Sequence, residues 1–331
     1  MGVEAKPDCN FSALGGTSPH EADDARYRQY RAEWEGRPRR FEAGAFPVHL
    51  DLEATSRCNL KCTFCDKLPF LPREKLGDMD FGLFGRILDE GREHGLCGLK
   101  LSYRGEPLLH PRIADMVRKA KDCGVIDVYF NTNGMLLTET MAAQLMDAGL
   151  DRVSISVEGT DANAFEAARV GAKFERIKAN AARLIELRER RRLDHPKVRI
   201  QTVALPGLDL TAYAAYWSAY CDQTAAIDYK DPATLPEQAR EAPGWACPQP
   251  WQRLTIEWDG TVHPCNNDDQ ARALVGNARE MSIAECWRAS CVEGLRNLHQ
   301  AGRSHLAEAC AGCPWRAAQV AKAQADVGHQ P

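Results

Sequence analysis

The stretch Cys58-Asn-Leu-Lys-Cys62-Thr-Phe-Cys65 decides the interpretation of this 331-residue chain, because it places three thiols within eight residues, shortly after a predicted strand at 48–54. In a barrel of parallel strands, the loop after a strand lies at the C-terminal mouth, where active sites form. Three thiolates on a short loop can hold three corners of an iron–sulfur cube and leave the fourth iron open. A structural zinc site would instead use four ligands from two pairs. A redox-sensing trio or chance clustering is the remaining alternative.

Short apolar runs alternate with longer amphipathic runs around this loop, and this alternation predicts the fold. Strands are expected at 48–54, 98–103, 125–131, 151–157, 197–205 and 225–229, and helices at 80–94, 111–123, 139–148, 174–191 and 211–221. Strand–helix alternation favours a parallel sheet with crossover helices. A closed eight-unit barrel usually needs about 250 residues, which is more than this region offers. We therefore expect an α/β fold built on a partial (β/α)6 barrel.

The chain divides into four predicted parts. Residues 1–45 form an N-terminal extension that is irregular apart from a charged helical stretch at 21–35, and residues 46–235 form the barrel. A linker is marked by Pro232, Pro236 and Pro243, since proline clusters interrupt regular structure. Residues 236–318 form a small α+β domain with a hairpin around Asp259-Gly260, a strong hairpin signal. Helices are expected there at 282–299 and 304–309, and residues 319–331 form a tail.

The composition indicates a globular cytoplasmic protein. The chain is 44% hydrophobic and 27% charged, has a net charge of −4 and contains 13 cysteines. This charge does not favour a nucleic-acid or membrane partner. No run approaches the roughly 18 apolar residues of a membrane span, and the first residues resemble neither a secretory signal nor a myristoylation site. In a reducing compartment so many cysteines favour metal ligation or thiol chemistry over disulfides.

A second set of cysteines lies in the predicted C-terminal domain. Its members are Cys247, Cys265, Cys310 and Cys313, and the last two form a Cys-Ala-Gly-Cys pair. Four thiolates would saturate one [4Fe–4S] cluster and leave no open iron. A structural zinc ion with four cysteine ligands has similar chemistry and stays open as the alternative.

The spacing Cx3Cx2C after the first strand of a partial barrel resembles the radical S-adenosylmethionine (radical SAM) superfamily, and the resemblance covers about residues 48–232. The resemblance implies a [4Fe–4S] cluster on Cys58, Cys62 and Cys65, whose open iron is chelated by the amino and carboxylate groups of SAM. It also implies that one electron, from an external reductant such as flavodoxin or ferredoxin, releases a 5′-deoxyadenosyl radical.

Further residues match the SAM-binding motifs of that superfamily in the order of the strands. Phe64 matches an aromatic near adenine, and Gly105-Glu106-Pro107 resembles a Gly-Gly-Glu-Pro motif, although Tyr103-Arg104 stand where more glycine is common. Asn133 after the third strand, and Ser154 and Ser156 on the fourth, match positions that face the ribose and carboxylate of SAM. Without the resemblance, the phenylalanine would be interpreted as a core residue and the Gly-Glu-Pro and Asn133 segments as turns. The two serines would be interpreted as part of an alternating strand.

The C-terminal cysteines resemble the SPASM/twitch extension, in which a hairpin and a helix carry an auxiliary cluster. A full SPASM domain has further cysteines after its CxxC, but Gln319 and Ala323 stand at the equivalent places. The resemblance therefore implies a single auxiliary [4Fe–4S] cluster, as in the twitch form, and two clusters in all. An auxiliary cluster with no open iron is suited to moving electrons.

The resemblance favours an oxidoreductase that dehydrogenates a secondary alcohol of a small polar substrate, a sugar or aminocyclitol, in natural-product or polysaccharide biosynthesis. Epimerisation, diol dehydration and modification of ribosomal peptides are the alternatives within the fold; a non-catalytic Fe–S or zinc protein is the remote one. No residue is marked as a catalytic acid or base. A thiol that returns hydrogen would indicate epimerisation, and six cysteines remain unassigned: Cys9, Cys97, Cys123, Cys221, Cys286 and Cys291.

Overall fold

A six-stranded parallel sheet forms the centre of the molecule. The computed structural model describes residues 4–5, 11–16, 24–65, 71, 75–229, 245–268 and 271–327. The parallel strands follow one another in chain order, so that each crossover connects neighbours: β3 (His49–Leu52), β5 (Gly98–Lys100), β6 (Asp127–Thr132), β7 (Arg152–Ser156), β9 (Lys197–Ala204) and β10 (Gln223–Asp228).

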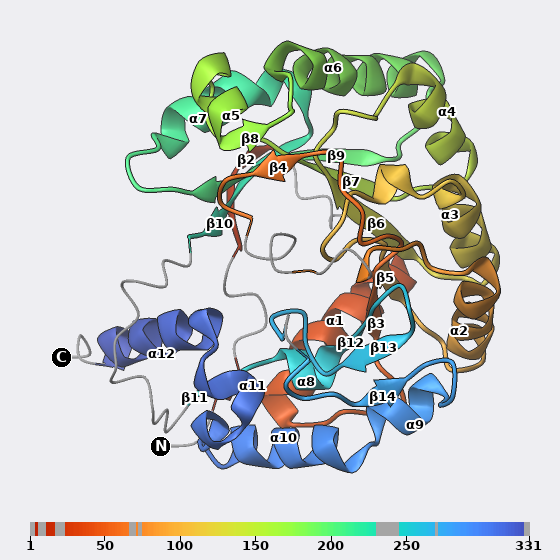
Figure 1. The fold of residues 1–331 in the computed structure, drawn as a ribbon, viewed down its shortest axis with the longest axis vertical. Coiled ribbons are helices and arrows are strands. Elements are labelled where there is room, and N and C mark those ends of the chain that lie inside the picture. Colours follow the sequence, from red (N-terminus) through yellow and green to blue (C-terminus); the bar gives the residue numbers. More distant parts are fainter. Residues whose placement is uncertain are drawn as a thin grey trace.

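Helices cover the outer face of this curved sheet (Figure 1). They are α2 (Phe81–Glu93), α3 (Ile113–Asp122), α4 (Glu139–Asp147), α6 (Phe174–Arg190) and α7 (Leu210–Trp217). The six predicted strands and five predicted helices are confirmed, with ends that shift by a few residues. The partial (β/α)6 barrel is therefore confirmed. No helix in the described part of the chain is both long and apolar enough to cross a bilayer.

The two faces of the sheet differ in polarity, as strand alternation requires. Leu50 and Leu52 of β3 join the main hydrophobic core under the helices. His49, Asp51 and Glu53 alternate with them and are also fully buried, but on the concave side of the sheet. The barrel interior is therefore lined by polar and charged side chains, which need partners there.

Both edges of the parallel sheet are extended by strands from outside the barrel. At one edge β2 (Phe11–Gly16) pairs antiparallel with β10. At the other edge β12 (Arg253–Ile256) runs parallel to β3, and β13 (Thr261–His263) and β14 (Gly276–Asn277) continue the sheet. The ten-stranded sheet thus crosses from the barrel into the C-terminal domain.

The N-terminal prediction was partly wrong. The helix α1 (Ala25–Arg40) confirms the charged helical stretch, but residues 1–45 are not an irregular extension, because β2 completes the sheet. The helix buries Tyr27, Tyr30 and Trp34, whose spacing places them on one helical face. Tyr30 Oη lies 3.1 Å from His49 Nδ1 inside the barrel.

The C-terminal domain contains the predicted hairpin. β12 and β13 pair antiparallel across Asp259-Gly260, and Gly260 has a φ of 95°, which favours glycine. The predicted helix at 282–299 is two helices, α9 (Ile283–Trp287) and α10 (Ser290–Gln300), and 304–309 becomes a 3-10 turn (Ser304–Leu306) and α11 (Glu308–Ala311).

The predicted tail at 319–331 is helical as far as Val327, because α12 (Pro314–Val327) runs into it. The predicted linker around Pro232, Pro236 and Pro243 lies outside the described residues. Short elements that were not predicted include β14 and also β1 (Glu4–Ala5), β4 (Lys61–Cys62), α5 (Ala162–Ala168), β8 (Arg169–Val170), β11 (Trp245–Ala246) and α8 (Gln249–Gln252).

A buried ion-pair network joins the barrel to the C-terminal domain. Arg104 Nε and Nη2 donate to the two carboxylate oxygens of Glu53, at 2.8 and 2.7 Å. Arg104 Nη2 also lies 2.6 Å from Glu257 Oε2, directly after β12. The exposed fractions are 3% for the Arg104 side chain, 0% for Glu53 and 9% for Glu257. His263 Nε2, at 2.7 Å from Glu257 Oε1, extends the network into the hairpin.

Replacing Arg104 by methionine is expected to lower the free energy of unfolding by about 3–5 kcal/mol, because two buried carboxylates lose their cation. Urea unfolding followed by circular dichroism measures this loss. The matched control is Arg118→Met, which removes an exposed pair with Asp115 and is expected to cost less than about 1 kcal/mol. Equal effects of the two substitutions would contradict the structural role of the network.

Candidate active site

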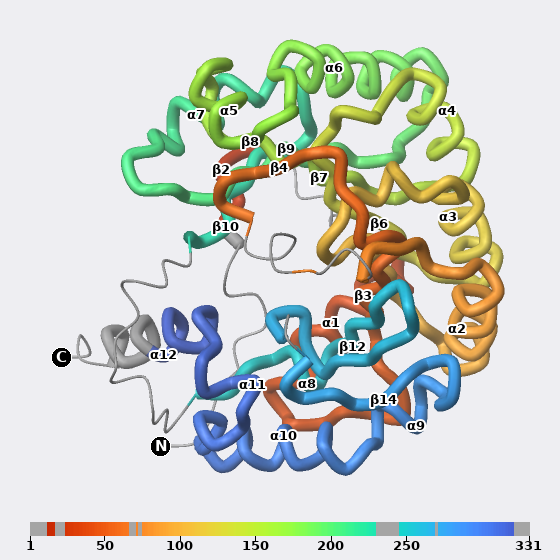
Figure 2. Tube along the Cα trace, viewed as in Figure 1, coloured from red at the N-terminus to blue at the C-terminus, as the bar shows by residue number. Residues whose placement is uncertain are grey.

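The first three cysteines lie on a loop that crosses the C-terminal end of the parallel sheet. The chain leaves β3, passes Cys58 and enters β4, which lies beside β8 (Figure 2). Cys62 pairs in register with Arg169. The backbone N–H of Thr63 donates to the carbonyl oxygen of Ala168 at 2.9 Å. The segment after β7 therefore holds the far end of the cysteine loop.

The three thiols interact electrostatically. Burial raises the pKa of Cys58 to about 11, and the charges of Glu106, Cys62 and Cys65 add to this. Burial also raises the pKa of Cys62. The free thiols of Cys58 and Cys62 are therefore protonated at neutral pH, so ligation of a metal by them would release protons. Three neighbouring thiols on one loop fit the three protein corners of an open [4Fe–4S] cluster.

Arg169 supplies positive charge beside this loop and was not predicted from the sequence. Its guanidinium pairs with the buried carboxylate of Glu158, and Nη1 lies 3.9 Å from Cys62 Sγ. Burial opposes the charge, but Glu158 offsets this, and the pKa of Arg169 is raised. A buried cation at this position would stabilise thiolates. Because Arg169 and Cys62 are 107 residues apart, no local sequence motif indicates their contact.

The predicted residues Gly105, Glu106 and Asn133 lie together against the cysteine loop. A Cβ on Gly105 would lie 2.3 Å from the carbonyl oxygen of Thr55 and 2.5 Å from that of Arg57, so only glycine permits this approach. The backbone N–H of Glu106 donates to Arg57 O at 2.7 Å. This turn therefore supports the start of the cysteine loop.

The Glu106 carboxylate is buried at this junction. It accepts hydrogen bonds from Thr132 Oγ1 at 2.7 Å, from the backbone N–H of Asn133 at 2.7 Å and from that of Leu108 at 3.1 Å. Burial nevertheless raises the pKa of Glu106 above its usual range. Asn133 Nδ2 donates to Asn59 Oδ1 in the cysteine loop at 2.8 Å. One carboxylate thus joins the ends of the second and third barrel strands.

Of the remaining predicted SAM contacts, two serines lie on β7, whereas Phe64 lies in the cysteine loop itself. Ser154 is paired in register with Asn131, deeper in the barrel than Asn133, while Ser156 is at the end of β7. Neither serine side chain bonds the cysteine loop among the described residues. Phe64 is partly buried, and the Arg169 guanidinium carbon lies 5.3 Å from its ring centre.

The four C-terminal cysteines also come together, from three segments. Cys247 follows β11, Cys265 follows β13, and Cys310 and Cys313 bracket the end of α11. Burial raises the pKa of Cys310 to about 12, and the charge of Cys313 adds to it. Burial and the charges of the other three thiols raise that of Cys247. The backbone N–H of Arg316 points at Cys313 Sγ, 3.4 Å away.

This donor set fits a cluster with four thiolate ligands. Across the described ranges, no three His, Cys, Asp or Glu side chains converge as closely as one metal ion would require. Each cysteine set is therefore recognised by the chain segments that bring its members together and by the charge interactions among its own thiols.

The other cysteines lie elsewhere. Cys123 and Cys286 are buried, Cys97 and Cys221 partly buried and Cys291 exposed. Cys221 Sγ donates to Trp217 O at 3.2 Å. No hydrogen bond joins these five residues to the cysteine loop in the described part of the chain. Cys9 lies outside the described residues.

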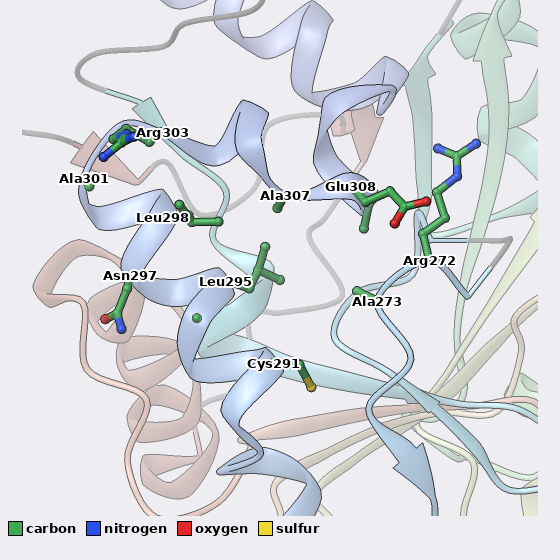
Figure 3. A pocket seen from close by; sticks show the side chains of 12 residues that line it. Arg272, Ala273, Cys291, Leu295, Asn297, Leu298, Ala301, Arg303, Ala307 and Glu308 are labelled. Carbon is green, nitrogen blue, oxygen red and sulfur yellow. The ribbon is translucent and has the colours of Figure 1, made fainter.

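A surface pocket of about 620 Å³ lies on the C-terminal domain between α10 and α11 (Figure 3). Its lining includes Leu295, Leu298, Ala307 and Ala309, with Arg272 at its rim. None of the residues of the cysteine loop at the barrel mouth lines it. The pocket is therefore separate from the predicted SAM site.

Comparisons with known families and proteins bear on both regions. Residues 52–210 match the family described as Radical SAM superfamily, and residues 247–314 match the SPASM family, described as an iron-sulfur cluster-binding domain. The chain is 28% identical over 323 residues to the tungsten-containing aldehyde ferredoxin oxidoreductase cofactor-modifying protein of Pyrococcus furiosus, covering 81% of this chain and 87% of that protein. It is 35% identical to a probable GTP 3′,8-cyclase of Methanococcus maripaludis over 41% of this chain and 45% of the cyclase.

Solved structures share the fold at low identity. BtrN in complex with AdoMet and 2-DOIA is 19% identical with a TM-score of 0.52, over 77% of this chain and 87% of that one. Streptococcus suis SuiB bound to precursor peptide SuiA is 16% identical with a TM-score of 0.58, over 85% of this chain and 74% of that one. These likenesses concern the fold alone.

Replacing Gly105 by alanine is expected to displace the backbone before Cys58 and to destabilise the protein by about 1–3 kcal/mol. Iron bound at the first site should fall accordingly. Iron analysis after anaerobic reconstitution, together with urea unfolding, measures both effects. The matched control is Gly85→Ala in α2, where a Cβ meets nothing within 4 Å and alanine should stabilise the helix by up to about 1 kcal/mol. Full iron binding by the Gly105 variant would contradict this role.

Alanine at Cys58, Cys62 and Cys65 is expected to leave about four irons and four sulfides per chain, held by the other four cysteines. Alanine at those four instead should leave a similar amount at the first site. Cys291→Ala, at an exposed thiol, is the control and should change nothing. Zinc in place of iron in the first variant would overturn the assignment of the auxiliary site.

Proposed function

Because this chain belongs to the radical SAM superfamily and carries a C-terminal SPASM domain, we propose that it dehydrogenates a secondary alcohol of a small polar substrate, a sugar or an aminocyclitol. Membership implies SAM and iron–sulfur clusters as cofactors, and a reductant as partner. We propose that the SAM-binding cluster is held by Cys58, Cys62 and Cys65. One auxiliary [4Fe–4S] cluster is held by Cys247, Cys265, Cys310 and Cys313. The proposed reductant is flavodoxin or ferredoxin, and the proposed location is the cytoplasm.

One observation carries this proposal: the four auxiliary thiols belong to a domain that is continuous with the barrel sheet. β12 pairs with β3, the strand that leads into the cysteine loop. Glu257, after β12, shares Arg104 with Glu53, after β3. When bound, SAM and its cluster supply a 5′-deoxyadenosyl radical, and a saturated auxiliary cluster supplies a one-electron acceptor.

These parts suit oxidation of an alcohol to a ketone. A SAM-derived radical at the Cys58, Cys62 and Cys65 site would accept the hydrogen atom of the carbon that bears the hydroxyl. A cluster held by Cys247, Cys265, Cys310 and Cys313 would accept one electron, and the hydroxyl proton would be released. The substrate would then lose two protons and two electrons in all, which balances the product ketone.

The residues at the barrel mouth have defined tasks in this scheme. Gly105 and Glu106 hold the cysteine loop through Arg57 O and through Asn133, which bonds Asn59. Arg169 balances negative charge beside Cys62. The proposed SAM contacts are Phe64, Gly105, Glu106, Asn133, Ser154 and Ser156. Buried polar groups here exclude water while keeping their own hydrogen bonds satisfied.

Peptide modification is the second candidate function. The likeness in fold to SuiB, which was solved with a precursor peptide bound, favours it. The described N-terminal elements pack on the barrel, since β2 pairs with β10 and α1 packs its aromatic face against Val48. We keep a small polar molecule as the favoured substrate, because a single auxiliary cluster suits oxidation of an alcohol.

The test is an anaerobic assay with SAM, a reductant and candidate sugars in heavy water. We expect 5′-deoxyadenosine and a ketone in equal amounts, with no solvent deuterium at carbon. Deuterium at carbon that disappears when one unassigned cysteine is replaced would identify an epimerase and refute the dehydrogenase. No 5′-deoxyadenosine from protein with intact clusters would refute the enzyme itself.

Replacing Cys310 and Cys313 by alanine should abolish ketone formation while 5′-deoxyadenosine still forms, because the electron acceptor is lost. The control is Cys291→Ala, which should form both products at the normal rate. Unchanged ketone formation by the double variant would contradict a redox role of the auxiliary site.

A further inference from the structure

One histidine lies among the four auxiliary cysteines. His299, at the end of α10, is 1% exposed. Its Nδ1 lies 3.1 Å from the backbone N of Cys247, and its Nε2 lies 3.5 Å from Cys310 Sγ. The ring therefore bridges the backbone of Cys247 and the thiol of Cys310, which belong to separate segments of the chain.

The hydrogen bond to Cys247 settles which ring nitrogen carries the proton. A backbone N–H can only donate, so Nδ1 of His299 must accept and is unprotonated. A neutral imidazole then has its proton on Nε2. This N–H points at Cys310 Sγ, which makes the contact a donor bond to sulfur. A protonated nitrogen has no lone pair for iron, so His299 is not itself a cluster ligand.

The surroundings of His299 fix the ring and keep it neutral. The rings of Trp245 and Trp251 meet it edge to face, at 6.1 and 6.2 Å between ring centres. Because Nδ1 accepts the hydrogen bond from Cys247, the ring is not the doubly protonated imidazolium. Arg316 is itself held by Ser304, since its Nε donates to Ser304 Oγ at 2.8 Å.

We propose that His299 is a positioning residue of the auxiliary site, which donates a hydrogen bond from Nε2 to the Cys310 sulfur and thereby raises the reduction potential of a cluster bound there. Hydrogen bonds to ligating sulfur withdraw electron density, and the reduced cluster carries more negative charge than the oxidised one. Such a bond therefore favours the reduced state. This makes the auxiliary site a better electron acceptor.

The test measures the potential of the auxiliary cluster alone. Alanine at Cys58, Cys62 and Cys65 provides the background, and His299→Phe keeps a ring of similar shape without either nitrogen. We expect the equilibrium constant for one-electron reduction to fall about tenfold, which corresponds to about 59 mV. A potentiometric titration followed by electron paramagnetic resonance measures it.

Two further variants complete the design. His299→Gln places an amide oxygen and an amide N–H close to the positions of the two ring nitrogens, so its potential should stay near that of the parent. His305→Phe removes a partly buried histidine from the same domain and should leave the potential unchanged. An unchanged potential in the His299→Phe variant with full iron content overturns the proposal. Loss of the cluster in both the Phe and the Gln variants also overturns it, because Gln keeps the donor.

A measurement on the protein with His299 unchanged does not depend on whether a variant folds. With [15N]histidine in the protein, pulsed electron paramagnetic resonance of the reduced auxiliary cluster should show a weak nitrogen coupling. Absence of that coupling overturns the hydrogen bond to sulfur. Neither experiment uses a substrate, so failure here leaves the proposed dehydrogenase reaction standing, and failure of that reaction leaves this hydrogen bond standing.

Discussion

A single buried arginine shared by two glutamates connects the two halves of this molecule. Arg104 binds Glu53 through both carboxylate oxygens and reaches Glu257 with the same guanidinium. Each charge in this group would be costly to bury alone. Because Glu53 leads into the cysteine loop and Glu257 directly follows β12, the packing of the C-terminal domain and the shape of the barrel mouth depend on each other.

The barrel mouth is built from neighbouring strand ends that support one another. Glu106 accepts bonds from the end of β6, and the turn before it approaches the cysteine loop as closely as glycine allows. Arg169 adds a cation beside Cys62 of that loop. The charge and the geometry of the first cysteine set thus come from four separate strand ends. The auxiliary set, in contrast, is surrounded by aromatic rings and by one neutral histidine.

The sequence predicted those strands, helices and turns that depend on residues close together in the chain. The six barrel strands alternate with amphipathic helices, and Asp259-Gly260 forms the hairpin, so these were confirmed. The strand β2 was missed because its pairing with β10 joins residues far apart in sequence. Arg104 was noticed only as a departure from glycine, since its partners come from two distant strands. Arg169 and His299 were not predicted for the same reason, because neither belongs to a sequence motif with a characteristic spacing.

The parallel pairing of β12 with β3 has a consequence for motion. Its backbone hydrogen bonds, together with the Arg104 network, leave the C-terminal domain no hinge at this edge. Rocking the C-terminal domain away from the barrel would break these strand bonds and separate Glu257 from Arg104. In the proposed reaction, such a continuous sheet would keep the distance for electron transfer between the substrate site and the auxiliary site constant.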